Sequence, residues 1–80
     1  MDTDLYSMIK ASIPDGIAAT EQAHNEGYCV RLTKSGESGW WMASFNEIER
    51  NSDPIAMQAM VESRMRLAIM TLENNLKSKR

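Results

Sequence analysis

Apolar residues recur three and four positions apart over the last third of the chain, from Asp53 to Arg80. This spacing predicts one long amphipathic helix. The Asp-Pro pair at its start is typical of a helix N-terminus, because the carboxylate can cap free amides and Pro suits the first helical position. No Gly or Pro follows Pro54 to interrupt the helix. The expected core face consists of Ile55, Met57, Val61, Met65, Ala68, Ile69, Leu72 and Leu76.

Two stretches in the middle of the chain, Tyr28 to Thr33 and Trp40 to Phe45, are β-branched, aromatic and alternating in polarity. With the segment of Gly and Ser residues between them, they predict an antiparallel β-hairpin. The expected register pairs Tyr28 with Phe45, and a slip by one residue would exchange the two faces. The face expected to pack on the long helix consists of Tyr28, Val30, Leu32, Trp41, Ala43 and Phe45.

The other face of the predicted hairpin carries Arg31, Trp40 and Met42. Arg31 can make a cation–π contact with Trp40 there, and Trp and Arg are favoured anchors of protein interfaces. Two interpretations stay open at this point. Either an N-terminal helix covers this face, or Arg31, Trp40 and Met42 form a partner-binding patch.

The long helix carries a second apolar seam away from its core face, and a surface helix of a small domain needs only one apolar stripe. We therefore expect either the N-terminal segment or a second copy of the chain to cover the seam. A homodimer is preferred, because joining two chains would bury the seam or extend the two-stranded sheet. The seam consists of Ala56, Ala59, Met60, Leu67 and Met70. Of these, Met60, Leu67 and Met70 are the candidate partner-binding residues.

The N-terminal part of the chain predicts helix. A short first helix is expected from Thr3 to Ala11, where apolar residues recur at helical spacing. A second helix is expected from about Ile13 to Glu26, ended by Gly27 in the left-handed conformation. Alternatively, the two form one helix bent at Pro14. Between hairpin and long helix, Asn46 to Glu49 is expected to form a single capped turn.

Eighty residues allow one domain with a single modest core. We expect residues 1–80 to form one α+β domain with an N-terminal helical segment, a two-stranded antiparallel β-hairpin and a long C-terminal helix packed across the hairpin. No apolar run reaches the roughly 18–20 residues of a membrane span. The acidic N-terminus is unlike a secretory signal, and a lone cysteine, Cys29, fits a reducing cytosol. A cytoplasmic protein without membrane association is expected.

The sequence shows no catalytic motif, and its lone His24 has no acidic residue placed to orient it. His24 and Cys29 together cannot supply the four ligands of a zinc site. We expect no enzyme activity, no metal and no cofactor. Basic residues gather at the C-terminus, where Lys77, Lys79 and Arg80 could contact nucleic-acid phosphates, although cations are also favoured there by the helix dipole. A net charge of −2 makes nonspecific nucleic-acid binding weak.

After the Asp-Pro pair, the run of Ala56, Met57, Val61, Ser63 and Arg64 follows a Trp-bearing hairpin. This arrangement resembles the closing helix of small bacteriophage early-region accessory proteins of the NinX-like sandwich type, which usually show more Trp and Gly around the hairpin. The order of helix, hairpin, Asp-Pro and helix is also similar to some small anti-CRISPR proteins. The resemblance implies a phage- or prophage-encoded cytoplasmic protein that acts by binding a host or phage protein complex.

The leading expectation is therefore a small non-catalytic protein–protein interaction module of the phage accessory or inhibitor type. The first alternative is a nucleic-acid-binding protein that uses Arg31, Trp40 and the basic tail. The second is a small-molecule-binding protein with a pocket at the dimer seam.

Overall fold

A computed structural model describes residues 2–22 and 25–78 of the chain. Its elements are, in order, α1 (Asp2–Ala11), β1 (Ala18–Gln22), β2 (Gly27–Lys34), β3 (Glu37–Ser44), α2 (Phe45–Arg50) and α3 (Pro54–Ser78). The strands form a three-stranded antiparallel sheet in the order β1-β2-β3. The chain is therefore α+β, as the sequence predicted, with one strand more than the expected hairpin.

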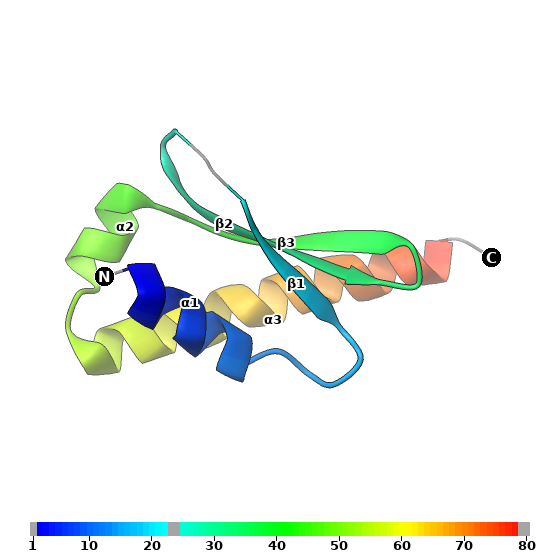
Figure 1. Cartoon of the computed structure of the whole chain (residues 1–80), viewed down its shortest axis with the longest axis horizontal. Helices are drawn as coiled ribbons and strands as arrows, with labels where there is room; N and C mark the ends of the chain where they lie inside the picture. The colour runs from blue at the N-terminus through cyan, green and yellow to red at the C-terminus, as the bar shows by residue number, and fades with distance from the viewer. Residues whose placement is uncertain (1, 23–24, 79–80) are drawn as a thin grey trace.

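The helices α1 and α3 lie side by side on one face of the sheet (Figure 1), so the molecule has a helical layer and a sheet layer. The long helix α3 lies along β3, and α2 lies at the end of the sheet where β3 ends. The core fills the space between the layers and consists of Leu5, Ile9, Tyr28, Val30, Leu32, Trp41, Ala43, Met60, Val61, Met65, Ala68 and Leu72.

The expected second helix from Ile13 to Glu26 is wrong, and so is the single bent helix. The segment Ala18–Gln22 is a strand that pairs antiparallel with β2. Pro14 disfavours helix continuation, and Gly16 adopts a left-handed φ of 90° that turns the chain back along the sheet. The third strand, β1, also stabilises the hairpin, because two strands alone are marginally stable in water. His24 lies outside the described residues.

The turn between β2 and β3 is shorter than expected. Ser35 and Gly36 have φ values of 53° and 82°, and positive φ at both central residues is the signature of a type I′ hairpin turn. The register consequently moves by two residues, so Tyr28 pairs with Ala43 instead of Phe45. A two-residue shift keeps each side chain on its predicted face. Phe45 alone leaves the sheet and begins α2.

The prediction of the long helix is confirmed. The Asp53 carboxylate accepts hydrogen bonds from the N–H groups of Ile55 at 3.1 Å and Ala56 at 3.2 Å, which caps α3 as expected. Most of the predicted core face is buried or partly buried, but Ile55, in the first turn, is exposed. The shorter α2 is capped by Ser44, whose Oγ accepts from the Glu47 N–H, and not by Asn46.

The sheet is joined to α3 by hydrogen bonds as well as by apolar packing. The indole N–H of Trp41, which is fully buried, donates to the Val61 carbonyl of α3 at 3.1 Å. The Asn75 side-chain amide donates to the Ser38 carbonyl of β3 at 2.9 Å. Trp41 also packs edge-to-face on Tyr28, with ring centroids 6.4 Å apart. The two hydrogen bonds hold α3 along β3. Because α1 and α3 lie on the same face, the described part of the chain places no helix over the opposite face of the sheet.

Candidate functional site

The sheet face turned away from α1 and α3 is the most distinctive surface of the described residues, and we call it the outer sheet face. It is formed by Ala18, Thr20, Gln22, Cys29, Arg31, Thr33, Ser38, Trp40, Met42 and Ser44, which alternate with the core positions along the three strands. The Trp40 side chain is 39% exposed and that of Met42 is 54% exposed. Arg31 is the one charged residue of the set. The interpretation in which an N-terminal helix covers this face is therefore wrong.

Arg31 and Trp40 form an organised pair on the outer sheet face. They are directly opposite each other on β2 and β3, and the guanidinium carbon lies 5.7 Å from the centroid of the indole ring. The Arg31 Nε also donates to Ser38 Oγ at 3.0 Å. The predicted cation–π contact is thus confirmed, with a direct pairing in place of the expected diagonal one. A side chain held in this way loses less conformational freedom when it binds a partner.

Cys29 lies on the outer sheet face opposite Met42, but its neighbours bury it. Burial raises the pKa of its thiol above the usual range, because the thiolate would lose solvation. The thiol is therefore neutral near physiological pH and poorly nucleophilic.

Slow reaction of Cys29 with a thiol reagent is the corresponding prediction. The raised pKa lowers the fraction of thiolate, and burial keeps the reagent away from the sulfur. The native protein should therefore react with a disulfide reagent at pH 8 at least about tenfold more slowly than the urea-unfolded chain. Absorbance of the released chromophore measures both rates. Equal rates would mean that the thiol is open on the outer sheet face.

The residues of the predicted apolar seam of α3 differ in their exposure to solvent. Met60 is buried in the core, whereas Leu67 and Met70 remain 55% and 58% exposed. The N-terminal segment therefore does not enclose the whole seam. These residues also lie on the helical layer, so they form no single patch with Arg31, Trp40 and Met42.

The predicted basic tail is only partly described. Lys77 is exposed in the last turn of α3, where the helix dipole favours a cation. Lys79 and Arg80 lie outside the described residues.

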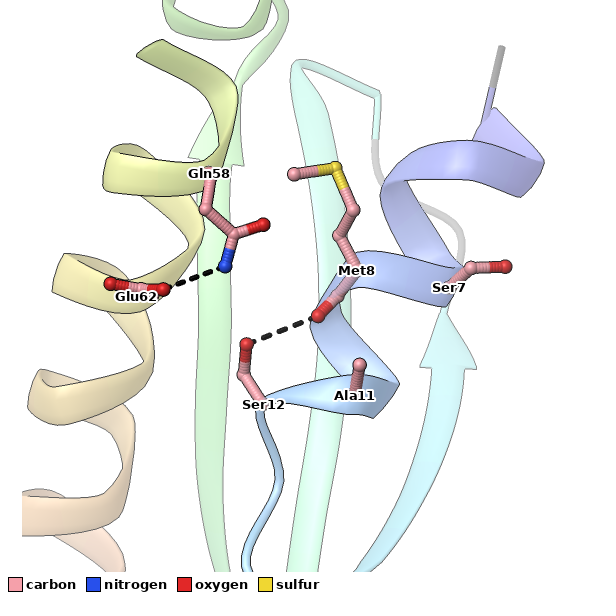
Figure 2. A pocket seen from close by; sticks show the side chains of 6 residues that line it. All are labelled: Ser7, Met8, Ala11, Ser12, Gln58 and Glu62. Carbon is pink, nitrogen blue, oxygen red and sulfur yellow. Dashed lines mark hydrogen bonds between the residues drawn. The ribbon is translucent and has the colours of Figure 1, made fainter. Parts of the chain in front are cut away.

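A surface hollow of about 550 Å³ separates α1 from α3 and is lined by Ser7, Met8, Ala11, Ser12, Gln58 and Glu62. Figure 2 shows two hydrogen bonds among these lining residues. Ser12 Oγ donates to the Met8 carbonyl at 3.1 Å, and the Gln58 amide donates to the Glu62 carboxylate at 2.6 Å. The Ser12 hydroxyl and the Glu62 carboxylate are thus each bonded to another lining residue.

Within residues 2–22 and 25–78, no group of three or more His, Cys, Asp or Glu side chains is placed to hold a metal ion. None of the helices described there is both long enough and apolar enough to span a bilayer. Comparisons with protein-family models, curated proteins and solved structures found no match to the chain.

Proposed function

We propose that the protein is a small non-catalytic protein-binding module whose partner docks on the outer sheet face. The observation that carries the proposal is the exposure of Trp40 and Met42 beside Arg31, on a sheet face that no helix of the described residues covers. Trp and Arg are the residues most often found at the energetic centre of interfaces. Contiguous exposed apolar side chains on a small protein are typical of binding surfaces.

The resemblance of the α3 sequence to phage accessory proteins supports a more specific proposal. On this basis the protein is a phage-type accessory protein or inhibitor, and its partner is a protein complex of the host cytoplasm. The chain supplies the recognition surface, and the partner supplies the activity that is modified.

Loss of partner capture by Trp40→Ala is the expected result that tests this proposal. Tagged wild-type protein and variant are used to capture partners from a bacterial lysate, and captured proteins are quantified by mass spectrometry. Removing an anchor of this kind typically weakens binding by about 2 kcal/mol or more, roughly thirtyfold.

Phe45→Ala is the matched control, because Phe45 is an exposed aromatic residue in α2 outside the outer sheet face. It should capture the same partner at the wild-type level. Equal capture by wild type and Trp40→Ala would contradict a binding role for the outer sheet face.

Self-association stays a prediction alongside this proposal. Leu67 and Met70 are available for it on α3, and light scattering of the purified protein reports the mass directly.

Nucleic-acid binding is a second candidate function. The exposed Trp40 ring next to Arg31 on an open antiparallel sheet is the kind of platform on which an unpaired base can stack. Against it, Arg31 is the one cation of the outer sheet face, and phosphate contacts normally dominate affinity for nucleic acids. A gel shift with single-stranded RNA tests this candidate: a retarded complex that Trp40→Ala loses supports nucleic-acid binding, and no retarded complex contradicts it.

A further inference from the structure

The outer edge of β3 presents backbone groups that no strand of the described chain pairs. In a two-residue hairpin the residues beside the turn form a hydrogen-bonded pair, and such pairs then alternate along the ladder. Starting from Lys34 and Glu37, the even-numbered residues of β3 direct their N–H and C=O groups away from β2. The bond from the Phe45 N–H to the Glu26 carbonyl continues the odd-numbered series and agrees with this assignment.

Other parts of the chain limit both ends of this edge. At one end, the outward carbonyl of Ser38 accepts from the Asn75 side chain of α3. At the other end, β3 stops at Ser44 and the next residue begins α2. The outward N–H and C=O groups of Trp40 and Met42 remain between them, and together they can bond one added strand.

The edge also lacks the features that usually prevent strand addition. Natural edges carry charged residues, Pro or a bulge. From Ser38 to Ser44, β3 has no charged residue and no Pro, and its pairing with β2 is continuous. The opposite edge differs, because β1 is shorter and carries Glu21.

One side of α3 lies next to the β3 edge. Asn75 reaches the edge from α3, and the residues one and two helical turns before it are Thr71 and Leu67. Leu67 is exposed, and neither residue is charged. A strand added to β3 would place alternate side chains beside Leu67 and Thr71. The remaining side chains would lie beside Trp40 and Met42 on the outer sheet face.

Helix packing decides what can occupy the edge. Strands in a sheet are about 4.7–4.9 Å apart, whereas packed helices need about 8–10 Å between axes. Because α3 lies along β3 itself, a second copy joined through β3 would bring the two α3 helices too close together. An extended segment with no helix beneath it meets no such conflict.

We propose that the β3 edge binds an uncharged, extended peptide segment of the partner protein as a fourth strand, paired with the backbone of Trp40 and Met42. This inference rests on the proposed protein-binding function and specifies how the partner is held. The added strand extends the outer sheet face, so that the Arg31–Trp40 pair contacts the partner from the side.

Met42→Pro tests the proposed pairing selectively. Pro removes the outward N–H at this position, which takes no part in the pairing with β2, and Pro is tolerated in edge strands whose N–H faces solvent. Met42→Ala is the matched control, because it removes the same side chain and keeps the N–H. The probe is the set of peptides enriched by the wild-type protein from a displayed library of short random peptides.

We expect enriched peptides without central Pro or charge, and binding by Met42→Pro about tenfold or more weaker than binding by Met42→Ala. In the wild-type complex, amide hydrogen exchange at Trp40 and Met42 should slow. Equal binding by the two variants, unchanged exchange at these amides, or no enrichment over a blank surface would each overturn the inference. If Met42→Pro fails to fold, the exchange measurement on the wild type decides.

The same reagents separate this inference from the proposed function. Partner capture that Trp40→Ala loses and Met42→Pro keeps would overturn strand addition and leave the binding function in place. A wild-type dimer that Met42→Pro dissociates would identify a second copy as the occupant and overturn the peptide proposal.

Discussion

Trp41→Ala should remove most of the stability of the fold. The Trp41 side chain is fully buried between sheet and α3, donates to the Val61 carbonyl and packs edge-to-face on Tyr28. Truncating a buried Trp costs about 3–5 kcal/mol through lost contacts and the cavity left behind. Domains of this size have total stabilities near the lower end of about 5–15 kcal/mol. Urea unfolding followed by circular dichroism should show a midpoint near zero denaturant or an unfolded variant.

The adjacent Trp40→Ala is the natural control for this experiment. Because successive side chains of a strand point to opposite faces, Trp40 lies on the outer sheet face, where it is partly exposed. Its loss should cost no more than about 1 kcal/mol, mostly the cation–π contact with Arg31. Equal destabilisation by both variants would show that the two faces of the sheet are buried alike, contrary to the two-layer architecture.

Gly39→Val should be the second strongly destabilising change. A Cβ at Gly39 would lie 2.6 Å from the Ala68 carbonyl oxygen and 3.0 Å from Leu72 Cβ, both in α3. The helix backbone would have to move away from β3, and overpacking of this kind costs about 1–3 kcal/mol or more. We expect a loss near 3 kcal/mol, because the nearest atom belongs to the backbone of α3 and not to a flexible side chain.

Met42→Val on the outward side of the same strand is the control for Gly39→Val. Valine is favoured in strands, so propensity alone would predict that both changes are harmless. Thermal unfolding should show a large drop in the midpoint for Gly39→Val and little change for Met42→Val. A harmless Gly39→Val would mean that α3 does not pass as close to β3 as the structure places it.

The parts of the fold that the sequence predicted are those set by strong local signals. Asp53 and Pro54 mark the start of α3, and no breaker follows, so the helix could be placed almost to the residue. The hairpin register was wrong by two residues because Ser35 and Gly36 form the turn inside a longer segment of Gly and Ser residues. The face assignments still held, since side chains repeat every second residue in a strand.

The parts that the sequence missed depend on tertiary contacts. The strand β1 is short and poor in β-branched residues, and it is a strand because the exposed edge of β2 pairs with it. Pro14 and Gly16 were available as signals against a second helix, but helix propensity outweighed them. The packing of α1 beside α3 was one of two alternatives that the sequence left open for the apolar seam of α3.

Some features of the candidate site could be predicted from the sequence, and others could not. The alternation within the hairpin predicts that Arg31 and Trp40 share one face, and the structure confirms their cation–π contact. Their direct pairing across β2 and β3 was not predicted, because it depends on the two-residue turn. The burial of Met60 apart from Leu67 and Met70 could not be predicted, because helical spacing alone places all three on one seam. The open edge of β3 depends on strand order, which no local pattern contains.

The order of the strands also affects how the chain can fold. Each strand pairs only with its neighbours in sequence, and α3 follows β3 after the brief α2. The sheet therefore forms through short loops and no long-range crossover, and local contacts of this kind favour fast folding. A protein built in this way can reach its native state soon after synthesis, with little time for the exposed edge of β3 to attract other nascent chains.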